Sequence, residues 1–400
     1  MKPRPYLILF FMLSLFAFSH VSSADDNTKP AAKTESESGL KNPLRLVLPP
    51  IIYAVPGLET NVYFDNVVLA INPANYVFDV HCNRGFLQND RWTYTPEEKE
   101  IGDYAFELKI LDQNNQVVSS QKSRLRVVPA ATGKDKTLSL LMIGDSLTHG
   151  SIYARHVLEL SKKFEGPQLK FVGSHNPNND PEVRHEGYSG WTALRFATLF
   201  KETARTGDHK ERGSPFLYAD EQGKPKFDFP RYCKEFNDGK APDVVTIFLG
   251  PNDVYSASDE TIETIAGTML KNVGALVDMI QAYSKETKIG LMLPVPPAAT
   301  QNAFGNPYDG SLTRWQYKRN QQYVVELMSK IYKDKADQNI FLVPTNLNLN
   351  CVHNYPTRKG PLNSRNPQEV VRQNNAVHPD LNGYQQIGDS VFFWLKEMSK

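Results

Sequence analysis

Five short apolar runs, with helical patterns between them, constrain the fold of this chain more than any other feature. The runs cover residues 138–143, 169–172, 243–249, 289–293 and 340–343. Runs of this length suit strands that are buried on both faces, as parallel strands are in α/β proteins. We therefore predict an α/β domain over residues 137–400, with three layers in which helices cover both faces of a parallel sheet.

Two stretches give the clearest helical patterns. Apolar residues at positions 262, 265, 266, 269, 270, 273, 276, 277 and 280 fall on one side of a helix and form a continuous stripe. A second stripe, from Leu381 to Leu395, predicts a helix that closes the chain. Both lie where the alternation of strands and helices requires a helix.

Residues 44–131 carry a different pattern, with short strands and no convincing helix of ten residues. Between residues 104 and 110, apolar residues alternate with smaller or polar ones, which is the pattern of a half-buried strand. A polar patch at 112–116 predicts a hairpin turn. Together these features predict a small immunoglobulin-like β-sandwich. Its role is open between a structural or spacer domain and a module that binds carbohydrate or shapes the substrate site.

The first 43 residues are expected to lie outside the fold. Lys2 and Arg4 precede an apolar run, and small residues follow it at 22–24, so residues 1–24 predict a secretory signal peptide. An uncleaved membrane anchor is the alternative. Residues 25–43 are polar and predict a disordered linker. No later stretch approaches ~20 uninterrupted apolar residues, so we expect a secreted or periplasmic protein with no stable membrane insertion after cleavage.

Composition limits the classes of partner. The chain has 400 residues, enough for two domains, and a net charge of +1 with scattered cations, which argues against nucleic-acid binding. No metal site is predicted, because four histidines lack a ligand-like spacing: His175, His185, His209 and His353. One disulfide is allowed, but buried free thiols are the preferred interpretation of the three cysteines, Cys82, Cys233 and Cys351.

Four short motifs place polar groups where ligands bind in open parallel sheets, beyond the C-terminal ends of the strands. GDSLT at 144–148 follows the first strand, and GPND at 250–253 follows the third. GYSGWT at 187–192 lies between them, and VHP at 377–379 precedes the last helix. In this order and spacing, the motifs resemble those of the SGNH hydrolases, also called GDSL esterases, over residues 138–398. The resemblance implies a flavodoxin-like sheet and ester hydrolysis without a cofactor.

The resemblance assigns the nucleophile to Ser146 and the base to His378. A serine hydroxyl is a poor nucleophile until a base takes its proton, and an imidazole titrates near neutral pH and can return that proton. Each residue also has an ordinary alternative. Ser146 follows a strand and precedes a helical stretch, so it could serve only as a helix N-cap. His378 could be a surface-loop histidine.

The same resemblance places two oxyanion donors on Gly190 and Asn252, beside the N–H of Ser146. Gly190 lets the backbone approach the substrate, and the amide of Asn252 donates hydrogen bonds without competing as a base. The alternatives are a turn glycine at 190 and a loop cap at 252.

The sequence departs from the family at one position. The family usually has an acid three residues before the base histidine, and this chain has Asn375. A neutral amide can orient an imidazole but stabilises imidazolium much less than a carboxylate does. Three explanations remain: a Ser–His dyad, another acid that reaches the ring, or lost activity. Asp380 is near in sequence, but Pro379 is expected to direct it elsewhere.

The leading hypothesis is therefore a secreted serine esterase that forms an acyl-enzyme. By analogy with carbohydrate esterases of the family, its substrate is expected to be an O-acetyl group on a carbohydrate, small or polymeric. Two alternatives stay open: a lipase-like or lysophospholipase-like esterase, and a non-catalytic carbohydrate-binding relative.

Overall fold

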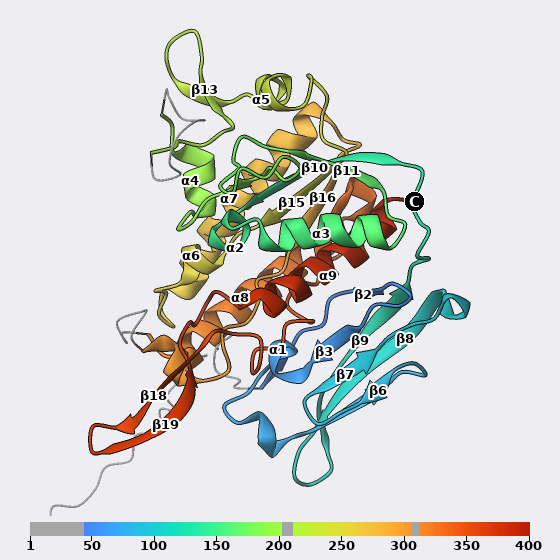
Figure 1. Ribbon diagram of the computed structural model, residues 1–400, viewed down its shortest axis with the longest axis vertical. Coiled ribbons are helices and arrows are strands. Elements are labelled where there is room, and N and C mark those ends of the chain that lie inside the picture. Colours follow the sequence, from blue (N-terminus) through green and yellow to red (C-terminus); the bar gives the residue numbers. More distant parts are fainter. Residues whose placement is uncertain (1–43, 202–210, 306–311) are drawn as a thin grey trace, which may run out of the picture. The chain divides into compact units, whose positions relative to one another are not determined.

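A parallel sheet organises residues 137–400 (Figure 1). Across the sheet, the main strands follow the order β11 (Gln168–Val172), β10 (Thr137–Gly144), β15 (Val244–Phe248), β16 (Lys288–Met292) and β17 (Ile340–Val343). The two-residue strand β12 (Glu186–Gly187) pairs with the C-terminal end of β10. All five predicted strands are confirmed, and their order is that of a flavodoxin-like doubly wound sheet.

The computed structural model describes residues 44–201, 211–305 and 312–400. The predicted signal peptide at 1–24, the predicted linker at 25–43 and His209 lie outside the described residues. Within the described ranges, no helix has both the length and the apolar character that crossing a membrane requires.

The strand order reverses between β10 and β15, which fixes where a ligand site can form. From β10 the chain crosses to β11 on one side, and it then returns past β10 to β15. Gly144 at the end of β10 pairs with Phe248 at the end of β15. Because the connections leave these two strands in opposite directions, the region beyond their ends is where ligands bind in sheets of this kind. The loops that begin at residues 145 and 249 both start there.

The helices form two groups. One group contains α3 (Ile152–Lys163) and α9 (Leu381–Met398), which pack against each other. The other surrounds the 22-residue helix α7 and comprises α4 (Ala193–Thr198), α5 (Phe229–Phe236), α6 (Pro251–Val254), α7 (Ile262–Tyr283) and α8 (Arg314–Tyr332). The predicted helices at 262–280 and 381–395 are confirmed. Right-handed crossovers on either side of the strand-order reversal place helices on opposite faces of the sheet.

The N-terminal region consists of strands joined by short turns. Four strands form one sheet, in the order β2 (Ile51–Ala54), β9 (Val117–Val127), β8 (Gly102–Leu111) and β5 (Val77–His81). Three more form a second sheet, in the order β3 (Thr60–Tyr63), β7 (Arg91–Tyr94) and β6 (Phe86–Leu87). Trp92 of one sheet and Phe106 and Leu125 of the other share one buried apolar cluster. The hairpin expected at 112–116 is confirmed, and the immunoglobulin-like assignment stays a prediction.

Residues 42–400 form one compact unit, and polar contacts join the N-terminal strands to the α/β part. Asp65 in the short helix α1 (Phe64–Val67) pairs with Lys318 and Arg314 of α8. The side chain of Lys318 is only 4% exposed, so Asp65 supplies the charge that this buried ammonium needs. The Asn66 amide donates to the Leu349 carbonyl at 2.7 Å. The predicted boundary between separate domains stays a prediction.

The antiparallel pair β18 (Thr357–Asn363) and β19 (Asn366–Gln373) forms a hairpin that projects from the rest of the chain (Figure 1).

The three cysteines all lie in the described residues, and none forms a disulfide. Cys233 and Cys351 are buried, as expected of free thiols, whereas Cys82 is half-buried.

Candidate active site

Ser146 is the first residue of the short helix α2 (Ser146–His149), directly beyond β10. The N-cap of this helix is Asp145, whose carboxylate accepts a hydrogen bond from the Leu147 N–H at 2.9 Å. The alternative that Ser146 itself is the cap is therefore wrong. The tight turn requires glycine at position 144, because a Cβ there would lie 2.0 Å from the Thr148 hydroxyl.

His378 lies in the loop between β19 and α9, and its ring reaches Ser146. His378 Nε2 and Ser146 Oγ are 2.8 Å apart, although 232 positions separate the two residues in the sequence. Burial lowers the pKa of His378 below its usual 6.5, because desolvation disfavours the imidazolium form. The ring is half-buried, and its lowered pKa leaves it neutral at neutral pH. It also lies within reach of the serine proton, as a general base must.

Gly190 occupies an exposed turn between β12 and α4. Its φ of +74° lies in the left-handed region that favours glycine. An added Cβ would meet no other part of the described chain within 4 Å, so the backbone at this turn is open to a bound molecule. The same φ also suits a plain turn glycine, and the oxyanion role of Gly190 stays a prediction.

Asn252, in α6, connects the serine block to the glycine block. Its side-chain amide donates to Asp145 Oδ2 at 3.3 Å and to the Trp191 carbonyl at 3.1 Å. Asp145 is next to Ser146 and Trp191 is next to Gly190, so the three motifs meet at this side chain. Both distances exceed the usual 2.9–3.0 Å, which indicates weak bonds that a stronger acceptor could replace.

Two acids, one fully buried and one half-buried, support this region, and neither was among the site residues predicted from the sequence. Asp145 is fully buried, and Asp253 accepts a hydrogen bond from the Ala193 N–H at 3.0 Å. The pKa of each carboxyl is raised to about 7, mainly by desolvation, and the charge of Asp253 contributes to the increase at Asp145. The signal was present in the sequence, since one acid lies directly before Ser146 and the other directly after Asn252.

Asn375 and Asp380 both use their side chains on nearby backbone groups. Asn375 Oδ1 accepts hydrogen bonds from the N–H of Val377 at 3.1 Å and of His378 at 2.9 Å. Asp380 is the N-cap of α9 and accepts from the Gly383 N–H at 3.1 Å. The expectation that Asp380 points away from the His378 ring is consistent with this cap. The side chain of Asn375 shapes the loop that carries His378.

A histidine cluster that the sequence analysis did not anticipate lies beyond α2. His175 Nε2 is 3.1 Å from His149 Nδ1, and the His175 and His185 rings are 5.3 Å apart between centroids. His185 Nδ1 accepts from the Gly187 N–H at 3.0 Å, and burial lowers the pKa of His185 well below its usual value. Among the described residues, no group of three or more His, Cys, Asp or Glu side chains is arranged to hold a metal ion.

Glu186 is the centre of a second buried cluster, next to the glycine block. It accepts hydrogen bonds from the Ser174 N–H at 2.6 Å and from the Tyr232 hydroxyl at 2.7 Å, and it also bonds the Tyr188 hydroxyl. Burial raises the pKa of this carboxyl. These contacts fix β12, and with it the start of the turn that contains Gly190.

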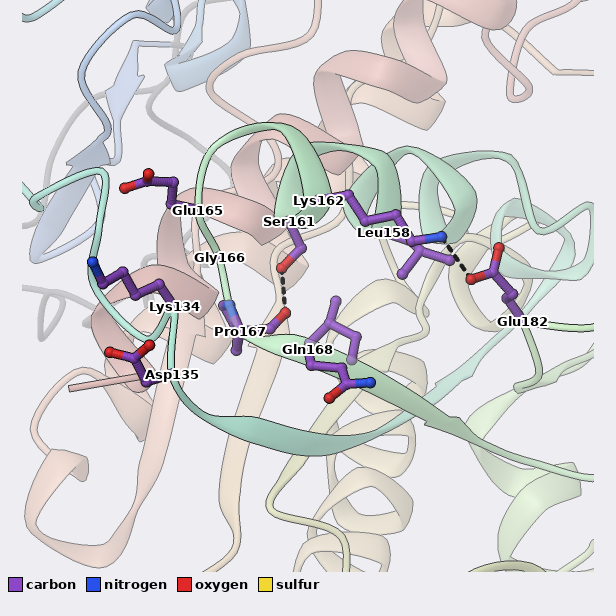
Figure 2. A pocket seen from close by; sticks show the side chains of 11 residues that line it. Lys134, Asp135, Leu158, Ser161, Lys162, Glu165, Gly166, Pro167, Gln168 and Glu182 are labelled. Carbon is purple, nitrogen blue, oxygen red and sulfur yellow. Dashed lines mark hydrogen bonds and ion pairs between the residues drawn. The ribbon is translucent and has the colours of Figure 1, made fainter.

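A hollow of about 520 Å³ lies at the other end of the sheet (Figure 2). Its lining includes Lys134 and Asp135, just before β10, and Gln168 at the start of β11. Ser146 follows the opposite end of the eight-residue strand β10, and at ~3.3 Å per residue the two places are roughly 25 Å apart. This hollow is therefore separate from the Ser146–His378 site.

Comparison with known proteins agrees with this geometry. The family model described as GDSL-like Lipase/Acylhydrolase matches residues 140–391, well over half of the chain. The chain belongs to this family. It is accordingly an ester-bond hydrolase with a GDSL-type α/β fold, and the match includes the segments that contain Ser146, Gly190, Asn252 and His378.

Solved structures resemble the chain at low sequence identity. A carbohydrate acetylesterase family member from Sinorhizobium meliloti is 15% identical, with a TM-score of 0.37, and the match covers 65% of this chain and 98% of that one. Axe2, an acetylxylan esterase from Geobacillus stearothermophilus, is 15% identical, with a TM-score of 0.33 and coverage of 67% and 96%. No curated protein matches the sequence.

Proposed function

We propose that the protein is a secreted serine esterase that removes O-acetyl groups from a carbohydrate, with Ser146 as nucleophile and His378 as base. The observation that supports it most directly is the distance of 2.8 Å between Ser146 Oγ and His378 Nε2. A hydroxyl and a neutral imidazole at this distance can exchange a proton, which is what activates a serine.

The first half of the reaction acylates Ser146. Its Oγ attacks the ester carbonyl carbon while His378 Nε2 takes the hydroxyl proton. The tetrahedral intermediate then collapses, the bond between the carbonyl carbon and the sugar oxygen breaks, and His378 returns the proton to that oxygen. The sugar leaves as an alcohol, and the acyl group stays on Ser146.

The oxyanion of the intermediate needs donors in fixed positions. The N–H groups of Ser146 and Gly190 and the side-chain amide of Asn252 supply them in this proposal. The amide of Asn252 is held at 3.1 Å from the Trp191 carbonyl. A charged oxygen is a better acceptor than a carbonyl, so it would displace that weak bond as charge develops.

The second half of the reaction releases the acid. His378 takes a proton from water as the water oxygen attacks the acyl carbon. The second tetrahedral intermediate then collapses to acetic acid, and His378 returns the proton to the leaving Oγ of Ser146. Every proton moves through His378 Nε2, and the lowered pKa of this ring keeps it in the neutral form that can accept a proton at neutral pH.

The substrate class rests on less direct support than the reaction. A predicted signal peptide would export the protein to a place where polymeric carbohydrate is accessible. The exposed turn at Gly190 has open space around its backbone, which suits an ester on a large molecule. The strand-rich N-terminal region adds surface next to the α/β part, as a module that contacts carbohydrate would.

A panel of esters tests the proposal. The wild-type protein and Ser146→Ala would be compared on p-nitrophenyl acetate, p-nitrophenyl palmitate and acetylated xylan, with circular dichroism as the check on folding. We expect acetate release from the acetyl esters, little turnover of the palmitate, and a loss of at least about a thousandfold in Ser146→Ala.

Each contrary result has a separate meaning. Rapid palmitate hydrolysis with little acetate release would replace the carbohydrate substrate by a lipid. Near-normal turnover in a folded Ser146→Ala protein would exclude Ser146 as the nucleophile. Wild-type protein that hydrolyses none of the three esters would contradict the proposed function as a whole.

A further inference from the structure

The hairpin formed by β18 and β19 carries a concentrated positive charge. Between residues 357 and 373 it has one acid, Glu369, and four cations: Arg358, Lys359, Arg365 and Arg372. This net charge of +3 contrasts with +1 for the whole chain. Apart from Arg372, which is partly covered, the charged side chains are exposed. The hairpin is thus a local cationic surface on an almost neutral protein.

The charges are placed in a way that folding alone does not favour. Arg358 and Arg372 are direct cross-strand partners, and like charges at such positions destabilise a strand pair. Arg372 donates to the carbonyls of Pro361 and Leu362 at 3.1 and 2.9 Å, which holds its guanidinium on the hairpin. Among the described residues, no carboxylate forms an ion pair with any of the four cations. A bound anion would relieve this repulsion.

The hairpin is anchored close to the candidate active site. Gln373, the last residue of β19, is buried; its side chain accepts from the Thr300 N–H at 2.9 Å and donates to the Cys351 carbonyl at 2.8 Å. His378 follows five residues later, so the base of the hairpin lies within about 18 Å of it. Figure 1 shows the hairpin on the side of the sheet where α2 and α6 follow the strand ends.

We propose that this hairpin binds a carboxylate-bearing polysaccharide, so that the acetyl esters cleaved at Ser146 lie on an acidic polymer. This inference rests on the proposed function. Guanidinium groups match carboxylates in shape and charge, and spaced cations suit the repeated carboxylates of a uronate chain. Strands of seven and eight residues reach roughly 25 Å, which is longer than a small ester needs.

Other polyanions fit the hairpin less well. Residues 357–373 include no Phe, Tyr or Trp, so the hairpin lacks the aromatic platforms on which nucleic-acid bases stack. The same lack removes the interfacial aromatic anchors typical of membrane-surface segments. Leu362 and Val371 are its exposed large apolar residues in the described chain, too few for a membrane-binding face.

The test compares two triple variants of the full chain that remove the same charge. The hairpin variant carries Arg358→Gln, Lys359→Gln and Arg365→Gln, and leaves Arg372 and its hydrogen bonds intact. The control carries Lys240→Gln, Lys271→Gln and Lys333→Gln, all exposed and away from the hairpin. Acetate release would be measured on acetylated polygalacturonate, acetylated xylan and p-nitrophenyl acetate, at low and at high salt.

We expect the hairpin variant to lose about tenfold in kcat/KM on acetylated polygalacturonate, through KM, and to change less than twofold on the two neutral esters. High salt should remove most of the difference in kcat/KM between the wild type and the hairpin variant on acetylated polygalacturonate. The control variant should match the wild type. An equal loss on acetylated xylan, or no loss on polygalacturonate, would overturn the inference while leaving the esterase proposal intact.

Binding experiments test whether the hairpin binds the polysaccharide, independently of ester turnover. Calorimetry with polygalacturonate that carries no acetyl groups should show weaker binding for the hairpin variant, even if no ester were turned over. Sedimentation with phosphatidylserine vesicles tests the other source of negative charge. Vesicle binding that depends on the hairpin, with no polygalacturonate binding, would overturn the proposal.

Discussion

The two sides of the Ser146–His378 pair are supported by different chemistry. On the serine side, the fully buried carboxyl of Asp145 and the half-buried carboxyl of Asp253 lie next to the motif residues, each with a pKa raised to about 7. On the histidine side, the neutral amides of Gln373 and Asn375 form hydrogen bonds with backbone groups of the segments that hold the His378 loop. These two acids therefore lie beside Asn252, the proposed oxyanion donor, rather than at the position where the family usually has an acid.

In a Ser–His–Asp triad, one acid both orients the histidine and stabilises its imidazolium form. This chain has a neutral amide at that position instead. The neutral amide of Asn375 shapes the loop through backbone N–H groups, and burial keeps the imidazole of His378 neutral. The buried acid Asp145 instead accepts a hydrogen bond from the amide of Asn252, the proposed oxyanion donor. We therefore expect kcat to fall little when the amide of Asn375 is changed. It should fall much more when Asn252, the proposed oxyanion donor, is removed.

The largest effect is expected from removing the base. His378→Ala should lower kcat on p-nitrophenyl acetate by at least about a thousandfold, because nothing then takes the serine proton. His81→Ala is a matched control, since His81 is an exposed histidine in β5 that bonds only locally to Asp79 in the described chain. Similar losses in both variants would mean that His378 is not the base.

The next effect tests the oxyanion side. Asn252→Ala should lower kcat by roughly a hundredfold to a thousandfold and leave KM nearly unchanged, as expected of a donor that acts on the transition state. Steady-state kinetics on p-nitrophenyl acetate measure both constants. A change confined to KM would assign Asn252 to ground-state binding instead.

A smaller effect on kcat is expected from changing Asp145, the buried acid that accepts a hydrogen bond from Asn252. Asp145→Asn should lower kcat about tenfold, because an amide can present a donor where Asn252 needs an acceptor.

The free energy of unfolding should respond to Asp145→Asn in the opposite direction. A carboxyl with a raised pKa is harder to ionise in the folded chain, so the wild type loses stability as pH rises from the unfolded pKa towards about 7.

Thermal unfolding at pH 8 checks this sign. Asp145→Asn should unfold at a temperature no lower than that of the wild type. Asp243→Asn is the control, because Asp243 is an exposed acid at the opposite end of the sheet and accepts from the Ser139 N–H at 2.7 Å. A loss of stability in Asp145→Asn at pH 8, with unchanged kcat, would contradict the role given to this acid.

The smallest effect is expected at Asn375. Asn375→Ala removes the acceptor for two backbone N–H groups and introduces no charge, so kcat should fall about tenfold or less. Asn375→Asp should increase kcat and raise the pKa of His378, since a carboxylate stabilises imidazolium.

The pH profile of kcat/KM distinguishes these variants. The base must be neutral, and the pKa of His378 lies below 6.5, so the wild-type acid limb should fall below that value. The limb should move to higher pH in Asn375→Asp. If Asn375→Ala were as damaging as His378→Ala, the amide would be an essential partner of the ring, and the contrast between the two sides would fail.

The sequence predicted the elements whose signal is local. The five buried strands and α7 follow from periodicity, and Ser146, Asn252 and His378 follow from motifs at strand and helix ends. The β18–β19 hairpin was missed because Gly360, Pro361 and Pro367 interrupt any strand pattern, and proline is tolerated there only because the hairpin has free edges.

Long-range contacts could not be predicted in the same way. The bond between Asp145 and the amide of Asn252 joins residues 107 positions apart, and the one between Tyr232 and Glu186 joins residues 46 apart. Their burial depends on packing that a single sequence does not specify. The departure at Asn375 was visible in the sequence, but its bonds to the backbone of the His378 loop required coordinates.

The most direct test of the account is covalent labelling with a fluorophosphonate, followed by mass spectrometry of the intact protein and of its peptides. The reagent reacts only with a serine that a base has activated. We predict one adduct per chain, located on Ser146, absent from Ser146→Ala and much slower in His378→Ala. An active protein labelled on another residue, or a His378→Ala variant labelled as fast as the wild type, would contradict the claim that Ser146 and His378 act as nucleophile and base.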